Sequence, residues 1–387
     1  MKPLRYIKLT ALCLALLAMG AITATAAAPA KSIAAQLQPF VEKGEMAGAV
    51  ALVASKDKVL AVEAVGFADV AAKRVMKTDA MFWIASQSKP ITGVALMILV
   101  DEGKLSLDDA VEKYLPEFKK LTVVIGKEAP RKPAHPITVR EVMCHTSGMP
   151  FKSAAENPTL DGLSLRDAVL SYAKTPLNAE PGTKYQYSNA GINTGARLIE
   201  VIAKQSYESF MDERLFHPLG MKDTTFWLSK EQITRLATPH KPNAAKTALE
   251  TTTISQLIYP LDDRKKRYPM PAGGLFSTAA DVAKLCQMVL NGGELNGKRY
   301  LSAAAVKQMT SRQTPATLTG YGVGWSTGGT TFGHGGALAT NMSIDTQSGL
   351  ITVWLVQHAG YIGDGGKAQG VFNQAAKAQF APPPAKK

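Results

Sequence analysis

Runs of apolar residues near the start of the mature sequence predict a helix followed by a hairpin. Residues 31–44 repeat apolar side chains at helical spacing. Two strand-like runs follow at residues 48–54 and 59–66, and the polar residues 55–58 separate them. Short apolar runs joined by a polar turn are typical of an antiparallel hairpin.

A buried helix is predicted shortly after Ser86. Residues 91–102 carry Val, Leu, Met and Ile on every side, and Gly103 follows as a stop. Pro90 fits only in the first turn of this helix, where its missing N–H costs nothing. We therefore expect Ser86 at the mouth of a helix that lies in the core.

The remaining patterns divide the chain into two regions. Residues 105–270 are mostly helical patterns broken by Pro and Gly, with segments near residues 139–144, 164–172, 190–204 and 207–215. Strand patterns return at residues 322–325, 330–334, 341–345 and 350–357, followed by a helix at 367–380. This order predicts an α+β fold, in which an antiparallel sheet from the N- and C-terminal segments is flanked by helices and carries a mostly helical inserted region. We expect a cleft where the two regions meet.

The N-terminus has the pattern of a secretory signal peptide. Basic residues precede a short apolar run, and residues 24–26 form a small-x-small pattern, so we expect residues 1–26 to be removed by a cut after Ala26. Neither this run nor any later segment is long enough for an ordinary membrane span. We expect a periplasmic or secreted protein with one domain at residues 27–380 and a disordered tail at residues 381–387.

The positive charge of the chain does not by itself indicate nucleic-acid binding. The formal net charge is +13, and loss of the three basic leader residues leaves +13 − 3 = +10. The cations are scattered apart from the run at residues 264–267, and export separates the protein from cytoplasmic nucleic acid. We expect a solvated basic face and a small-molecule ester, amide or peptide as the partner. The sequence leaves the oligomeric state open.

The sequence contains no pattern that predicts a metal or an organic cofactor. Motifs such as His-Glu-x-x-His and Cys-x-x-Cys are absent, and the six histidines are dispersed. Two cysteines remain after processing, Cys144 and Cys286, each in a partly apolar helical segment. An exported protein could pair them, but this apolar setting favours two buried thiols.

A serine and a lysine three residues apart form the first candidate for chemistry. Positions i and i+3 share a helix face, so Lys89 can point at Ser86. A serine hydroxyl needs a proton acceptor to become a nucleophile, and lysine can accept only when its pKa is lowered. The apolar residues 82–84 favour that lowering. Ser-x-x-Lys alone recurs by chance, and the alternative interpretation of Ser86 is a helix N-cap.

Two later motifs complete a family pattern. Residues 187–189 are Tyr-Ser-Asn at the start of a predicted helix, and residues 334–336 are His-Gly-Gly at the end of a predicted strand. Ser-x-x-Lys, Tyr-x-Asn and His-x-Gly in this order resemble the serine hydrolase superfamily of class C β-lactamases, penicillin-binding DD-peptidases, D-aminopeptidases and family VIII esterases. The likeness covers nearly the whole mature chain, through "HTSGMP" at 145–150, "HPLGMKDT" at 217–224, "GGLFSTAADVAKL" at 273–285 and "YGVGW" at 321–325.

The resemblance implies a role for each motif residue. Ser86 would attack a carbonyl and hold the acyl group, while Lys89 and Tyr187 share the proton transfers; which of the two is the base stays open. The N–H groups of Ser86 and Ala337 would form the oxyanion hole. Asn189 would hydrogen-bond a polar group of the substrate. The third motif would complete the substrate site with His334, Gly335 and Gly336.

The third motif departs from the Lys-Thr-Gly that is usual in β-lactamases of this type. His334 and Gly335 replace a fixed charge and a hydroxyl that help to hold a carboxylate, and a histidine of ordinary pKa would be only partly charged at neutral pH. We therefore expect a serine hydrolase that cleaves an ester or amide through an acyl-Ser86 intermediate, with ester hydrolysis first. A D-amino-acid peptidase, a DD-carboxypeptidase or a weak β-lactamase is the alternative, and a penicillin-binding sensor without turnover is a further one.

Other conspicuous residues have plainer interpretations. His145 is expected to fix a loop by hydrogen bonds rather than to act as a general base. Ser147 lacks the Gly-x-Ser-x-Gly elbow of an α/β-hydrolase. Tyr321 and Trp325 could line the cleft, but aromatic residues on a sheet more often pack, and His358 is expected to be structural.

Overall fold

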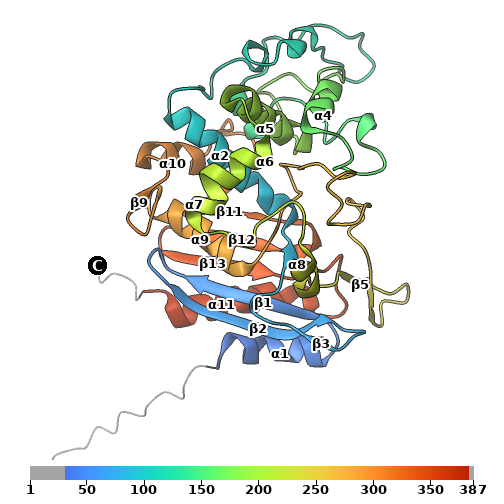
Figure 1. Ribbon diagram of the computed structural model, residues 1–387, viewed down its shortest axis with the longest axis vertical. Coiled ribbons are helices and arrows are strands. Elements are labelled where there is room, and N and C mark those ends of the chain that lie inside the picture. The colour runs from blue at the N-terminus through green and yellow to red at the C-terminus, as the bar shows by residue number, and fades with distance from the viewer. Residues whose placement is uncertain (1–30, 383–387) are drawn as a thin grey trace, which may run out of the picture. The chain divides into compact units, whose positions relative to one another are not determined.

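The central sheet combines strands from both ends of the chain. The computed structural model describes residues 31–382, and within them one antiparallel sheet has the strand order β10-β11-β12-β13-β1-β2-β3 (Figure 1). Its strands are β1 (Gly48–Ala54), β2 (Val59–Asp69), β3 (Arg74–Val75), β10 (Ser326–Gly328), β11 (Thr331–Gly335), β12 (Asn341–Asp345) and β13 (Leu350–Leu355). The predicted α+β fold, with a sheet drawn from the N- and C-terminal segments, is confirmed.

Strand β1 lies between two apolar cores. All of its residues are buried. Because side chains alternate along a strand, Val50 and Leu52 face one hydrophobic cluster, while Ala51 and Val53 face another. A strand that is covered on both faces therefore appears in the sequence as an unbroken apolar run.

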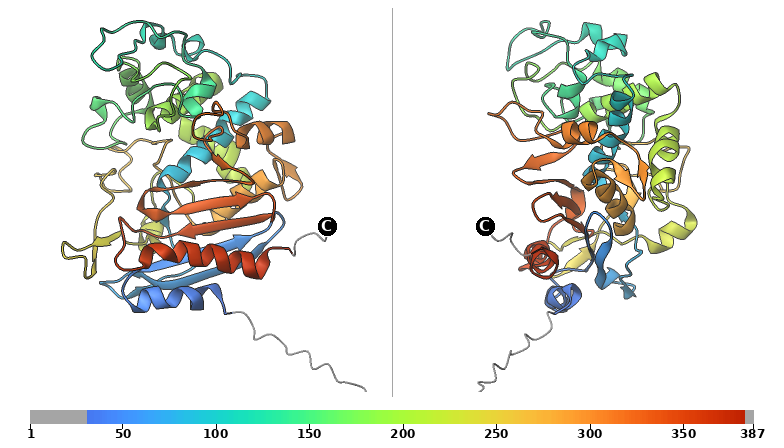
Figure 2. Two further views of the ribbon diagram at one scale, coloured as in Figure 1. Left: turned by 180° about the vertical axis from the view of Figure 1, so that it is seen from behind. Right: turned by 90° about the vertical axis from the view of Figure 1, so that its left-hand side faces the viewer.

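Helices cover both faces of the sheet. The helices that do so are α1 (Ile33–Glu42), α9 (Ala279–Leu290) and α11 (Ala368–Phe380). Figure 2 shows α1 and α11 packed together on one face, and α9 contacts β1 and β13 from the other. Leu37 of α1 and Phe372 of α11 belong to the same apolar cluster beneath β1. The helices predicted at residues 31–44 and 367–380 are thus confirmed, with boundaries shifted by up to two residues.

Helix α2 (Ser88–Asp101) is the buried helix that the sequence predicts. Every residue from Ser88 to Leu99 is buried, so the helix is surrounded by other elements rather than by solvent. Gly103 follows with a φ of 69°, a left-handed conformation that ends the helix as expected. The helix begins three residues earlier than predicted, and Pro90 lies in its first turn.

The helical region lies between two short strands that pair with each other, β4 (Phe82–Trp83) and β7 (Phe276–Ser277). After α2 it contains α3 (Val139–Met143), α4 (Leu165–Tyr172), α5 (Asn189–Ala203), α6 (Tyr207–Met211), α7 (His217–Leu219), α8 (Lys230–Arg235), and the strands β5 (His240–Pro242) and β6 (Leu249–Thr251). A π-helical segment at Asp212–Phe216 continues α6. Beyond β7 come α9, β8 (Glu294–Leu295), β9 (Lys298–Arg299) and α10 (Ala303–Thr310).

The strand predicted at residues 322–325 is wrong. These residues form a turn, and β10 begins only after them. Two glycines explain the difference, because a Cβ on Gly322 would overlap the Met309 carbonyl oxygen and one on Gly324 would lie 2.5 Å from the Lys89 carbonyl oxygen. The segment packs closely on α10 and on the first turn of α2 instead of pairing in the sheet. Its apolar residues have the sequence pattern of a strand, which explains the wrong prediction.

Both cysteines in the described residues are buried free thiols, as the apolar setting of Cys144 and Cys286 favours. Burial raises the pKa of Cys144 to about 11 and that of Cys286 to about 12, so both stay protonated near neutral pH. Within residues 31–382 there is no helix whose length and apolar character would let it cross a bilayer. The predicted leader at residues 1–26 and the tail beyond residue 382 lie outside the described residues.

Candidate active site

Ser86 lies in a tight turn that leads into α2. This 3₁₀ turn, η1 (Ala85–Gln87), follows β4, and Ala85 has a φ of 47°, a left-handed conformation that costs free energy for a residue with a Cβ. The Ser88 hydroxyl supports the turn by donating to the Ala85 carbonyl oxygen at 2.7 Å. Gln87 occupies the N-cap position of α2, so the N-cap interpretation of Ser86 is wrong.

Lys89 is fully buried, and three oxygen atoms surround its amine. Its Nζ lies 3.1 Å from Ser86 Oγ, 2.8 Å from Asn189 Oδ1 and 2.7 Å from the Ala272 carbonyl oxygen. The amide oxygen of Asn189 and the carbonyl of Ala272 can only accept, so each takes one N–H of Lys89. In the neutral amine the lone pair is then left for the Ser86 hydroxyl.

The protonation of Lys89 follows from its burial. Removing an ammonium from water disfavours the charged form, so burial lowers the pKa of Lys89 well below its ordinary value. No carboxylate contributes to this shift. The amine is thereby prepared to accept a proton, which is the property that the Ser-x-x-Lys chemistry requires.

The start of α5 (Asn189–Ala203) holds the second motif in place. Ser188 is the N-cap of this helix, and its hydroxyl oxygen accepts the Gly191 N–H at 3.0 Å. The same hydroxyl donates to the Pro150 carbonyl oxygen at 2.6 Å. Tyr187 directly precedes this capped end, so its backbone position is determined by the helix start.

Tyr187 reaches both members of the first motif. Its ring centroid lies 4.5 Å from Lys89 Nζ, and its hydroxyl hydrogen-bonds to Ser86. Burial raises the pKa of Tyr187 above its ordinary value, and the hydrogen bond with Ser86 offsets this only in part. The phenol therefore stays protonated at neutral pH. The structure thus brings Ser86, Lys89, Tyr187 and Asn189 together, as the motifs predict.

Strand β11 brings the third motif beside the Ser86 turn. A Cβ on Gly336 would overlap the Ile84 carbonyl oxygen, so only glycine allows this approach. The Gly336 N–H donates to the Thr340 carbonyl oxygen at 2.8 Å. Ala337 then begins the turn η6 (Ala337–Ala339), which packs against η1. The backbone N–H groups of Ser86 and Ala337 consequently belong to two adjoining turns.

His334 is buried and neutral, which corrects the expectation of a partly charged histidine. Its side chain is 6% exposed. Burial is the main cause that lowers the pKa of His334 to about 3. Its Nδ1 lies 2.5 Å from the Gly335 carbonyl oxygen, and its Nε2 lies 2.8 Å from the Tyr321 hydroxyl. The third motif therefore supplies no cation to a substrate carboxylate at neutral pH.

Two aromatic residues beside the site were not predicted to belong to it. For Tyr321, packing on the sheet was favoured over a place in the cleft, but the residue hydrogen-bonds to His334. Phe151 is 41% exposed, and its ring stacks on that of Tyr187 with centroids 6.4 Å apart and planes 24° apart. The Phe151 carbonyl oxygen accepts the Asn189 N–H at 3.0 Å, which fixes its backbone at the start of α5. The sequence signal for both was their place in or directly after a family segment.

His145 holds the second motif as the structural interpretation predicts. Its Nδ1 accepts the Ser188 N–H at 3.2 Å, so the ring proton lies on Nε2. Burial lowers the pKa of His145 well below its ordinary value. Its ring centroid is 4.6 Å from that of Tyr187, so it also supports the tyrosine from the side.

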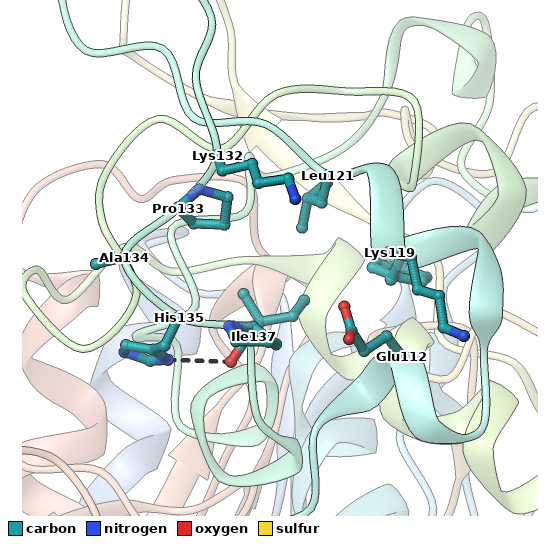
Figure 3. Close-up of a pocket in the computed structure, with 10 residues that line it drawn as sticks. Glu112, Lys119, Leu121, Lys132, Pro133, Ala134, His135 and Ile137 are labelled. Atoms are coloured by element: carbon teal, nitrogen blue, oxygen red, sulfur yellow. Dashed lines mark hydrogen bonds between the residues drawn. The ribbon is translucent and has the colours of Figure 1, made fainter.

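A separate pocket lies in the helical region (Figure 3). It is lined by Glu112, Phe118, Lys119, Leu121 and residues 132–137, and Figure 3 shows Glu112, Lys119 and Lys132 around it. None of the motif residues contributes to this lining. Across residues 31–382 no group of three or more His, Cys, Asp or Glu side chains is arranged to hold a metal ion.

Comparisons with known proteins agree with this architecture. A protein of Mycobacterium tuberculosis, MT1414, is 29% identical over 362 residues, which cover 84% of this chain and 89% of the relative. A Salmonella agona protein with the provisional name D-alanyl-D-alanine carboxypeptidase is 29% identical over 72% of this chain and 69% of its own length. The solved structure of EstCE1, described as a hydrolase with promiscuous acyltransferase activity, has the same fold, with a TM-score of 0.73 at 23% identity over 89% of this chain and 97% of EstCE1.

A family model completes the assignment. The model of the Beta-lactamase family matches residues 33–375, which include the Ser-x-x-Lys, Tyr-x-Asn and His-x-Gly motifs. The match therefore extends over most of the chain, from the start of α1 into α11. The protein belongs to the Beta-lactamase family, within the β-lactamase-related superfamily of serine hydrolases.

Proposed function

We propose that the protein is an exported serine hydrolase that cleaves a carboxylic ester through an acyl-Ser86 intermediate. The observation that carries this proposal is the setting of the Lys89 amine. Its two N–H bonds face oxygen atoms that only accept, and its lone pair faces Ser86 Oγ at 3.1 Å. A serine hydroxyl beside a buried neutral amine can lose its proton at neutral pH.

In the acylation step Lys89 accepts the Ser86 proton. The Ser86 oxygen forms a bond to the ester carbonyl carbon, and the carbonyl oxygen becomes an oxyanion between the N–H groups of Ser86 and Ala337. The bond to the leaving oxygen then breaks, and that oxygen takes a proton from Tyr187, which recovers one from Lys89. Lys89 is the proposed base rather than Tyr187, because burial raises the tyrosine pKa and lowers the lysine pKa.

In the deacylation step water replaces the alcohol. The Lys89 and Tyr187 pair takes one proton from water while its oxygen attacks the acyl carbon, and the same N–H groups hold the oxyanion. Collapse breaks the bond to Ser86 Oγ, which regains a proton from the pair. The products are a carboxylic acid and free enzyme, with no net proton left on the site.

Two features favour a neutral ester over a substrate that carries a carboxylate. His334 is neutral, so the position that holds a lysine in β-lactamases of this type offers no fixed charge. The exposed ring of Phe151 beside Tyr187 offers an apolar surface to an acyl or alcohol group. EstCE1, which has the same fold, is described as a hydrolase with promiscuous acyltransferase activity, and this supports the proposal of an ester substrate.

A substrate panel tests the proposal. Short-chain 4-nitrophenyl esters, a chromogenic cephalosporin, peptides ending in D-Ala-D-Ala and peptides starting with a D-residue are supplied to the wild type and to Ser86→Ala. We expect turnover of the esters by the wild type and none by the variant, with unchanged circular dichroism. Retained activity in Ser86→Ala would move the nucleophile elsewhere.

Amide hydrolysis is the second candidate, because a relative at 29% identity carries a carboxypeptidase name. Faster turnover of a D-Ala-D-Ala peptide than of any ester would favour it. A sensor that is acylated without turnover is distinguished by its time course. It would release about one equivalent of 4-nitrophenol per chain and then stop, whereas an enzyme continues to a steady state.

Export is tested by fractionation of cells that express the full chain. The proposal expects the activity in the periplasm or the medium and an N-terminus at residue 27, read by sequencing of the mature protein. Recovery of the full-length chain in the cytoplasm would contradict it.

A further inference from the structure

Tyr321 links the third motif to the segment that packs on the first turn of α2. Its side chain is 1% exposed, and its hydroxyl lies 2.8 Å from His334 Nε2 and 3.2 Å from the Gly324 carbonyl oxygen. His334 belongs to the third motif on β11. Gly324 packs on the first turn of α2, where a Cβ would lie 2.5 Å from the Lys89 carbonyl oxygen.

The partners of His334 determine the direction of its hydrogen bonds. The Gly335 carbonyl oxygen only accepts, so the Nδ1 that lies 2.5 Å from it carries the ring proton. The Nε2 of a neutral ring is then an acceptor, and the Tyr321 O–H donates to it at 2.8 Å rather than to the Gly324 carbonyl oxygen, which lies farther away at 3.2 Å. Burial raises the pKa of Tyr321 well above its ordinary value, so this donor keeps its proton.

This chain of hydrogen bonds ends on the backbone of the third motif. The His334 ring holds the Gly335 carbonyl, and that carbonyl shares a peptide plane with the Gly336 N–H. The Gly336 N–H donates to Thr340, so both sides of the plane are held. The Ala337 N–H belongs to the peptide that follows this plane. Holding the Gly335–Gly336 plane in place therefore limits the directions that the Ala337 N–H can take.

We propose that Tyr321 is a positioning residue that sets the separation of the Ser86 and Ala337 N–H groups through its hydrogen bond to His334. The inference rests on the proposed function, in which these two N–H groups stabilise the oxyanion. Tyr321 itself contacts neither the nucleophile nor the reacting carbonyl in this scheme. Its effect is on the transition state rather than on binding of the substrate.

Tyr321→Phe tests the proposal, because it removes one hydroxyl and retains the ring. With 4-nitrophenyl butyrate we expect kcat to fall by about 10- to 100-fold while KM changes by less than about twofold, since a small misplacement of the donors affects the transition state selectively. Phenylboronic acid, which forms a tetrahedral adduct with a serine oxygen, should lose affinity by the same factor. Unchanged kcat, a loss in KM alone, or unchanged boronate affinity would each overturn the proposal.

Tyr185→Phe is the matched control. The Tyr185 ring lies 6.0 Å from that of Tyr321 in the same aromatic cluster, and the proposal gives its hydroxyl no role. We expect this variant to keep the kcat and boronate affinity of the wild type. A loss equal to that of Tyr321→Phe would mean that the cluster acts only by packing, and the proposal would fail.

Two measurements separate this inference from the proposed function. ¹⁵N NMR of the wild type, with His334 assigned by comparison with His334→Gln, should show a protonated Nδ1 and a hydrogen-bonded Nε2 that loses its partner in Tyr321→Phe. The double variant Tyr321→Phe/His334→Gln should be no slower than His334→Gln alone, because Tyr321 acts through His334. Additive losses or an unchanged ¹⁵N shift would overturn the inference. Absence of any wild-type turnover would contradict the proposed function, and the NMR result would still decide on the hydrogen bond.

Discussion

Lowering the pH is expected to destabilise the protein through His334. An unfolded histidine has a pKa near 6.5, whereas burial, the main cause, lowers the folded value to about 3. Between pH 3 and pH 6.5 the unfolded chain binds a proton at this histidine, whereas the folded chain does not. The contribution of His334 to stability is therefore complete above pH 6.5 and is lost as the pH falls toward 3. The difference, 6.5 − 3 in pKa, corresponds to about 5 kcal/mol for this one buried ring.

The slope of this loss is the quantity to measure. When the unfolded chain binds one proton more than the folded chain, the free energy of unfolding falls by about 1.4 kcal/mol for each pH unit. This slope applies well below pH 6.5. Between pH 7 and pH 5 the contribution of His334 is thus about 2 kcal/mol. His358 is also buried, and its lowered pKa of about 4 adds a similar loss, so the whole curve cannot be assigned to one residue.

Urea unfolding of the wild type and of His334→Gln isolates the contribution. Tryptophan fluorescence gives the unfolding free energy at pH 7, 6 and 5 by linear extrapolation. We expect the variant to lose about 2 kcal/mol less than the wild type over this range. His217→Gln, which removes an exposed histidine, should follow the wild-type curve. Parallel curves for the wild type and His334→Gln would refute the reasoning.

Three further variants test the site and its supports. Tyr187→Phe should lower kcat by about 10² to 10⁴-fold through lost proton transfer, and a near-normal rate would leave Lys89 as the only proton carrier. Phe151→Ala should raise KM for aryl and long-chain esters more than for acetate esters, because an exposed apolar platform is lost; equal KM values would remove that role. Gly336→Ala should lower both kcat and the melting temperature, because its Cβ would overlap the Ile84 carbonyl oxygen. Its control Gly370→Ala, in open space on α11, should stabilise the fold by about 1 kcal/mol in calorimetry, and a cost equal to that of Gly336→Ala would argue against a local clash.

Local patterns predicted the fold wherever burial is uniform along an element. Strand β1 and helix α2 are covered on all sides, so their apolar runs and the stop at Gly103 identified them directly. The failure at residues 322–325 has a physical cause. The close approach of the backbone at Gly324 to the backbone at Lys89 is a tertiary contact. No local sequence pattern distinguishes Gly322 and Gly324 from glycines at an ordinary strand end.

The site was predictable in its identities and less so in its electrostatics. Spacing alone placed Lys89 beside Ser86, and the family motifs added Tyr187 and Asn189. The Ala272 carbonyl that takes the second N–H of Lys89 comes from a distant segment and has no side-chain signature. The charge of His334 was predicted wrongly, because a pKa depends on burial that the neighbouring sequence does not reveal.

The packing of α1 on α11 has a consequence for how the chain can be connected. The start of α1 and the end of α11 lie at the same side of the sheet (Figures 1 and 2). Strand β1 pairs with both β2 and β13, so hydrogen bonds rather than covalent continuity unite the two terminal segments. A circular permutant, with a short linker between α11 and α1 and new ends opened in the exposed β5–β6 turn, should therefore assemble the same layers and keep its nucleophile in place.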